Sequence, residues 1–147
     1  MVVLALSERP TIFSVSRVVV GIRLFLENYW EARGTNSTAK CIETSLFLAP
    51  ILNEQVGGEW EVWCGLHNPP GAECAEAHCW VREKYSGLNA DLTGDQFDLE
   101  RVIVDYDREM PYQQAGIFED SDEWLEADLA ALRAAYQRHS GLAPALA

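Results

Sequence analysis

Three residues of this chain carry the side chains that nucleophilic thiol chemistry requires. Cys41 begins an amphipathic stretch, His78 begins an aromatic stretch, and Asp91 opens the triplet AspLeuThr. Such chemistry needs a thiolate, an imidazole that takes and returns its proton, and a group that orients the imidazole. The three residue types, in this order, indicate a cysteine hydrolase or acyltransferase.

The context of Cys41 favours an ionised thiol. Apolar spacing predicts a helix over about 38–54, apolar over most of its surface and therefore central and buried, with Ser37 or Thr38 as its N-cap. Backbone N–H groups in a first helical turn lack intrahelical partners, and the helix dipole favours negative charge there. Both effects stabilise a thiolate and can hold an oxyanion, and Lys40 adds a positive charge nearby.

The surrounding pattern predicts helices first, then a sheet, then a closing helix. A first helix is expected over 12–33, ended by Gly34. Alternation predicts four strands, over 59–65, about 77–84, about 89–93 and 101–106. A loop over 66–76 is expected between the first two strands. A last helix is expected from near Asp120, where AspSerAspGlu resembles a capping box, and its buried stripe comprises Leu125, Leu129, Leu132 and Tyr136. The class is α+β, in a single domain over 1–147.

Alternation in the second strand sorts its side chains onto two faces. His78, Trp80 and Arg82 are predicted on one face, and Cys79 and Val81 on the other. Trp80 would then share the face of His78, where it would either line the site or pack in the core.

Two motifs carry a resemblance to a known superfamily. HisCysTrpValArgGlu (78–83) and AspLeuThrGlyAspGlnPhe (91–97) resemble motifs of the transglutaminase-like and papain-like cysteine proteases, most closely a compact bacterial or phage branch. Members place a cysteine at the start of a buried helix, then a His-x-Trp-Val strand and an Asp-x-Thr strand. The resemblance spans about 36–97, and Arg82 stands where the superfamily has a Glu.

The resemblance implies a fold and a set of roles. The fold would be a papain-like, transglutaminase-type core with N-terminal helices, a buried central helix packed on an antiparallel sheet, and a C-terminal helix. Cys41 would be the nucleophile, His78 the general base and acid, and Asp91 the orienting carboxylate. Asn36 is a candidate for a second oxyanion donor. The reaction would be peptidase, deamidase or transamidase chemistry on a peptide or protein substrate.

Composition limits the partners that we expect. The 147 residues carry a net charge of −12, which disfavours nucleic acid and anionic membranes as partners. Apolar runs fall far short of a membrane span, and the first ten residues lack the features of a signal peptide. We therefore expect a cytoplasmic protein whose four cysteines are free thiols.

Two alternatives compete with the enzyme hypothesis. Cysteines and histidines between positions 64 and 79 could suggest zinc, but no C-x-x-C pair occurs, and adjacent His78 and Cys79 would point to opposite strand faces. We therefore expect no metal and no other cofactor. The second alternative is a non-catalytic binding or regulatory module, of the kind found in phages and mobile elements, that retains the fold.

Overall fold

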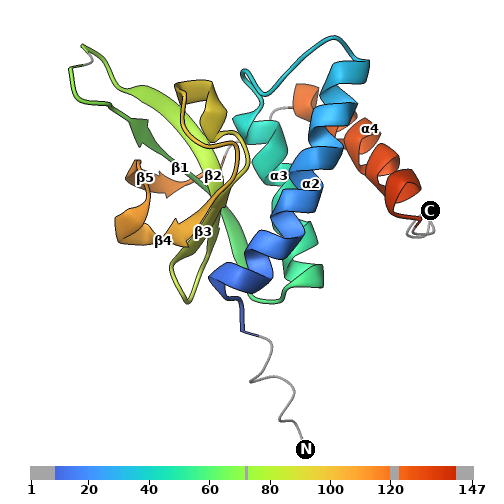
Figure 1. Cartoon of the computed structure of the whole chain (residues 1–147), viewed down its shortest axis with the longest axis horizontal. Helices are drawn as coiled ribbons and strands as arrows, with labels where there is room; N and C mark the ends of the chain where they lie inside the picture. The colour runs from blue at the N-terminus through green and yellow to red at the C-terminus, as the bar shows by residue number, and fades with distance from the viewer. Residues whose placement is uncertain (1–8, 72, 120–122, 142–147) are drawn as a thin grey trace, which may run out of the picture.

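The computed structural model of the chain describes residues 9–71, 73–119 and 123–141. These residues form three α-helices and one five-stranded antiparallel sheet, which confirms the α+β class (Figure 1). The helices are α2 (Ile12–Ala32), α3 (Cys41–Gln55) and α4 (Glu123–Ser140). The strands are β1 (Trp60–His67), β2 (Glu76–Glu83), β3 (Leu88–Asp91), β4 (Ile103–Tyr106) and β5 (Gln113–Ile117), in the order β4-β3-β2-β1-β5. Two short 3-10 helices, η1 (Gly94–Phe97) and η2 (Asp107–Glu109), flank β4.

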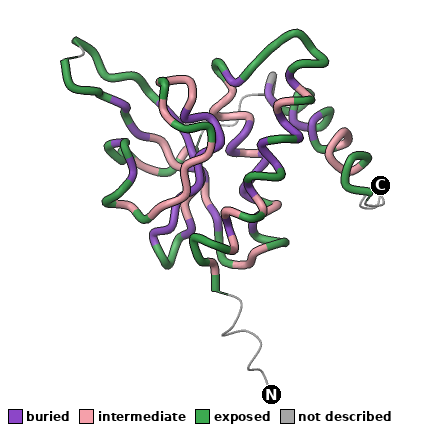
Figure 2. Tube along the Cα trace, viewed as in Figure 1, coloured by how far each residue is buried: buried purple, intermediate pink, exposed green. Residues whose placement is uncertain are grey.

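Helices α2 and α3 cover one face of the sheet, and α4 lies on their outer side (Figure 1). Helix α3 packs on β1 and β2, α2 packs on β3 and β4, and α4 packs on both other helices (Figure 1). The main core lies between these layers, where the buried stretches of the helices meet the strands (Figure 2). As predicted, α3 is the central helix, since it packs on the sheet more extensively than α2 does and also contacts both other helices. None of the helices in the described part of the chain is long and apolar enough to cross a bilayer.

Helix α2 begins and ends where its sequence predicts. Thr11 and Ser14 form a capping box, in which each side-chain oxygen accepts a hydrogen bond from the backbone N–H of the other residue. At the other end Gly34 adopts a φ of 70°, and its N–H donates to the carbonyl of Glu31. Glycine takes this left-handed conformation without a Cβ penalty, so the chain turns away here.

Helix α3 starts later than predicted, and its expected N-cap is wrong. Ser37 is buried, and its side chain hydrogen-bonds to Asp95 instead of capping the helix. Lys40 occupies the N-cap position without a side-chain cap, after Ala39 turns the chain with a φ of 60°. The first helical residue is therefore Cys41, whose turn of backbone N–H groups receives no side-chain cap.

The first hairpin, β1 with β2, has a buried surface on both faces. Cys79 and Val81 join the main core on the helix side, as the alternation predicts. On the other face Trp80 forms a second apolar cluster with Met110 and Tyr112. The register pairs Cys64 with Cys79 and Gly65 with His78.

Strands β1 and β5 differ from the prediction, whereas α4 agrees with it in its buried leucines. Strand β1 continues to His67, so the loop that follows is shorter than expected. Strand β5 was not predicted at all and adds to the free edge of β1. Helix α4 is present with Leu125, Leu129 and Leu132 buried, whereas most of the predicted capping box at 120–123 lies outside the described residues.

Candidate active site

Asp91, at the end of β3, is buried and holds four hydrogen-bond donors. Its Oδ1 accepts from the backbone N–H of Thr93 at 2.9 Å and from the Thr93 hydroxyl at 3.2 Å. Its Oδ2 accepts from His78 Nε2 at 2.8 Å and from the Tyr112 hydroxyl. The carboxylate is thereby fixed in position, and Thr93 provides a physical reason for the AspLeuThr spacing.

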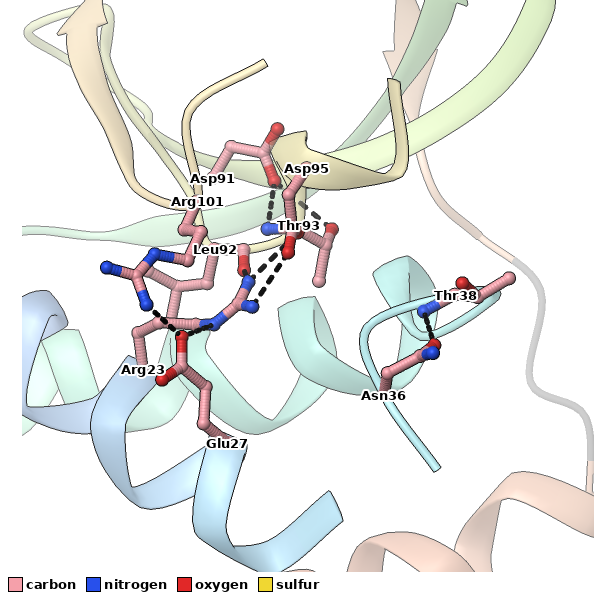
Figure 3. A network of polar contacts seen from close by, with 9 residues as sticks. All are labelled: Arg23, Glu27, Asn36, Thr38, Asp91, Leu92, Thr93, Asp95 and Arg101. Atoms are coloured by element: carbon pink, nitrogen blue, oxygen red, sulfur yellow. Dashed lines mark hydrogen bonds and ion pairs between the residues drawn. The ribbon is translucent and has the colours of Figure 1, made fainter. Parts of the chain in front are cut away.

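A buried arginine secures the turn that follows Asp91. Arg23 of α2 donates from Nη1 to the Leu92 carbonyl at 2.6 Å, and its two Nη groups bind both oxygens of Asp95 at 3.0 and 2.8 Å (Figure 3). The same side chain pairs with Glu27 one turn along the helix. A bidentate guanidinium–carboxylate pair has defined geometry as well as strength, so α2 positions the segment that carries Asp91.

His78 lies on β2 in an aromatic enclosure. The rings of Tyr112 and Phe97 have centroids 4.8 and 4.9 Å from the imidazole, and Trp80 stacks behind it at 6.2 Å. Burial alone would lower the pKa of His78, but the hydrogen bond to Asp91 and the interactions with Cys41 raise it to about 9. The imidazole is therefore held in its protonated form at neutral pH.

The two ring nitrogens of His78 have different surroundings. Nε2 is occupied by Asp91. Nδ1 is buried and has no hydrogen-bond partner of good geometry among the described residues, although the ring lies close enough to the Cys41 thiol to shift its pKa. Nδ1 is therefore the nitrogen available for exchange of a proton with Cys41, and loose geometry before substrate binds is common in such pairs.

Cys41 is half-buried at the start of α3 and has a lowered pKa. The side-chain hydrogen bond from Cys79 lowers it most, burial opposes this effect, and the hydrogen-bonding and charge interactions with His78 lower it further, to about 5. The backbone N–H of Cys79 also favours the ionised form. With a pKa of about 9 for His78, the pair is a thiolate and an imidazolium between those two values.

The edge of β2 explains how Cys41 reaches both His78 and Cys79. Strand β3 pairs with β2 only at Val81 and Arg82. The preceding part of β2 has no partner in β3, so the N–H of Cys79 is available to the Cys41 sulfur. The start of α3 thus lies against a short stretch of β2 that pairs with β1 but not with β3.

The structure brings together Cys41, His78 and Asp91 but not the two predicted substrate-contact residues. Asn36 is exposed in the loop before α3, and its Oδ1 accepts from the N–H of Thr38 (Figure 3). Trp80 is completely buried, and its Nε1 donates to Asn89, so it packs behind His78 and does not line an open site. The candidate oxyanion donors are instead the uncapped N–H groups at the start of α3.

Two residues of the site were missed from sequence. Tyr112 comes from the segment between η2 and β5 and orients Asp91 through its hydroxyl. Cys79 was placed only on the strand face opposite His78, yet its thiol makes the largest contribution to the lowered pKa of Cys41. Of the other cysteines and histidines between positions 64 and 79, Cys64 lies beside Cys79, with the two Sγ atoms 3.1 Å apart, whereas His67 stacks on Phe97 and Cys74 is exposed on the turn between β1 and β2.

Comparison of the chain with models of protein families, with curated proteins and with solved structures gives no match.

Proposed function

We propose that this protein is a thiol-dependent acyl transferase or amide hydrolase that acts on a peptide or protein substrate. The observation that carries the proposal is the buried hydrogen bond between His78 Nε2 and Asp91, beside a Cys41 thiol with a pKa of about 5. A nucleophile, a base and an orienting group in this relation are the parts of a cysteine triad. The order of the elements is also compatible with a papain-like, transglutaminase-type core.

The proposed reaction begins with attack of the Cys41 thiolate on a carboxamide carbon. Negative charge develops on the carbonyl oxygen, where N–H groups of the first turn of α3 can donate hydrogen bonds to it. Collapse of the tetrahedral species breaks the C–N bond, and the His78 imidazolium gives its proton to the departing amine or ammonia. The product is a thioester on Cys41 and a neutral His78.

The second half of the reaction uses the neutral imidazole as a base. His78 takes a proton from water or from an amine, whose oxygen or nitrogen attacks the thioester carbon and displaces the Cys41 thiolate. Water completes peptide cleavage or deamidation, and an amine completes transamidation. Asp91 holds the ring through Nε2 throughout, while Tyr112 and Thr93 hold Asp91.

The test with the least dependence on substrate choice uses p-nitrophenyl acetate, a small activated ester. The wild type should release nitrophenolate, carry an acetyl group on Cys41 detectable by mass spectrometry, and lose that group by hydrolysis. Cys41→Ala should form no such adduct, and His78→Gln should form it but retain it, because no base activates water. The matched control is Cys74→Ala, which removes an exposed thiol far from the site and should behave as the wild type. Equal acetylation and release in His78→Gln would contradict the proposal.

The choice between water and amine is tested with glutamine-containing peptides and an added primary amine. Ammonia release without incorporation of the amine would identify a deamidase, incorporation would identify a transamidase, and chain cleavage would identify a peptidase. Cys41→Ala should abolish whichever activity occurs, and Asp91→Asn should reduce it less completely, since Asp91 orients the base and does not attack. Activity that survives Cys41→Ala would mean that the chemistry lies elsewhere in the molecule.

A further inference from the structure

Cys79 lies between two other thiols. On the hairpin it is the register partner of Cys64, and the two Sγ atoms are 3.1 Å apart. On the side of α3 it lies close enough to Cys41 that its thiol and its backbone N–H both lower the pKa of the Cys41 thiol. Three of the four cysteines of the chain therefore form one group, and Cys74 lies apart from it on an exposed turn.

The geometry of the Cys64–Cys79 pair is suited to a disulfide. Residues directly opposite each other in an antiparallel pair have Cα atoms about 4.5–5.5 Å apart, within the range that a disulfide spans. The sulfur atoms need to approach by only about 1 Å to reach bonding distance. The strands need not change register for this bond to form.

We propose that Cys41, Cys79 and Cys64 form a peroxide-reactive dithiol–disulfide site, in which Cys41 reacts first and the disulfide finally rests between Cys64 and Cys79. The oxidant is a hydroperoxide, such as hydrogen peroxide. This redox chemistry is independent of the amide chemistry proposed above, and the Cys41 thiolate is the group that the two have in common.

The steps balance as a two-electron oxidation of two thiols. The Cys41 thiolate attacks one peroxide oxygen, the O–O bond breaks, and protonation of the departing hydroxide gives water and a sulfenic acid on Cys41. The Cys79 sulfur then attacks the Cys41 sulfur and releases a second water, which leaves a Cys41–Cys79 disulfide. Attack by Cys64 on the Cys79 sulfur transfers the disulfide to the hairpin and returns Cys41 as a thiolate.

Thiol acidity gives the relay its direction. Cys41 has the lowered pKa, so it is the ionised thiol that peroxide meets, and it is also the better leaving group in the last exchange. Hydrogen bonding to Cys41, burial and the contact with Cys64 raise the pKa of Cys79, which makes Cys79 a poor first target for peroxide. Cys79 reacts instead once a sulfenic acid forms beside it.

The test is oxidation of the full-length protein with hydrogen peroxide, followed by alkylation and cleavage after glutamate residues. This cleavage places the four cysteines in separate peptides, because Glu43, Glu61, Glu73, Glu76 and Glu83 separate them. The wild type should accumulate a Cys64–Cys79 disulfide with Cys41 free. At pH 6, Cys41→Ala should slow formation of that disulfide by about sevenfold, since an ordinary thiol is only about 0.3 % ionised there and its greater intrinsic reactivity offsets only part of this difference.

Two further variants trap the intermediate species. Cys64→Ala should accumulate the Cys41–Cys79 disulfide, and Cys79→Ala should drive Cys41 to its sulfinic acid. Cys74→Ala is the matched control and should match the wild type. Formation of the Cys64–Cys79 disulfide at the wild-type rate in Cys41→Ala would overturn the relay, as would the absence of any disulfide in Cys64→Ala. Because no amide substrate is used, these results are independent of whether acyl transfer occurs.

Discussion

Replacement of His78 by Gln should change the rate at which iodoacetamide alkylates Cys41, with opposite signs at low and high pH. In the wild type the pKa of Cys41 is about 5. In the absence of His78, the hydrogen bond from Cys79 still lowers the pKa of Cys41, and burial still raises it. Loss of the imidazolium should therefore move the pKa of Cys41 toward the ordinary value of about 8.5. The midpoint of the pH–rate profile should move accordingly.

The magnitude follows from ionisation and nucleophilicity together. A complete return of the Cys41 pKa to about 8.5 sets the upper limit of the effect: at pH 6 the ionised fraction would fall from about 0.9 to about 0.003. A thiolate of higher pKa is intrinsically more reactive, by about 40-fold for this difference if the Brønsted coefficient is about 0.45, as in thiol–disulfide exchange. The variant should therefore react up to about sevenfold more slowly at pH 6 and up to about twentyfold faster at pH 8.5.

The assay measures alkylation of all four thiols in the same sample, with exposed Cys74 as the internal reference. The matched control is His67→Gln, which replaces another buried histidine, stacked on Phe97, that does not contribute to the pKa shift of Cys41. Its Cys41 profile should equal that of the wild type. A His78→Gln profile that superimposes on the wild type would refute the ion pair, and a faster rate at every pH would indicate unfolding instead.

Further predictions concern the same fold. The acetylation of Cys41 by p-nitrophenyl acetate should rise with pH through about 5, as Cys41 ionises, and a pH-independent rate would contradict this assignment. Tyr112→Phe keeps the ring but removes the donor to Asp91, so urea denaturation should show a free energy of unfolding lower by about 2 kcal/mol, together with slower Cys41 acetylation. In Gly65→Ala the new methyl group would overlap Trp80 and the carbonyl of Gln113, so the free energy of unfolding should fall by about 1–3 kcal/mol. In Gly21→Ala the methyl group enters open space on α2, so the free energy of unfolding should rise by about 1 kcal/mol. Hydrogen bonding to Arg82 holds the pKa of Asp107 at about 2 in the folded protein. The ionised carboxylate therefore stabilises the fold at pH values above the pKa that Asp107 has in the unfolded chain, and this stabilisation is lost as the pH falls toward about 2. The difference in urea midpoint between the wild type and Asp107→Asn should accordingly shrink as the pH falls from about 4 toward about 2.

The sequence predicts those parts of the site whose chemistry is local. Cys41 could be placed at a helix start because apolar periodicity follows it, and AspLeuThr marks a side chain that its own turn holds through Thr93. Alternation along β2 was enough to separate His78 from Cys79. These inferences depend on a few neighbouring residues each.

The parts that could not be predicted depend on contacts distant in sequence. Strand β5 has no apolar alternation, and it forms because β1 offers it an unpaired edge. Tyr112 reaches Asp91 only after that pairing brings its segment across the sheet. Ser37 looks like an N-cap, yet it is taken up by Asp95, a partner that no local pattern reveals.

The burial of β2 on both faces has a consequence for the tolerance of this strand to mutation. A strand at a protein surface usually accepts polar substitutions at every second position. Here His78, Cys79, Trp80 and Val81 are all at most 6 % exposed, and they contact two different sets of neighbours. A saturation mutagenesis map of the chain should therefore show a continuous intolerant block at 78–81, without the period of two that marks a half-exposed strand.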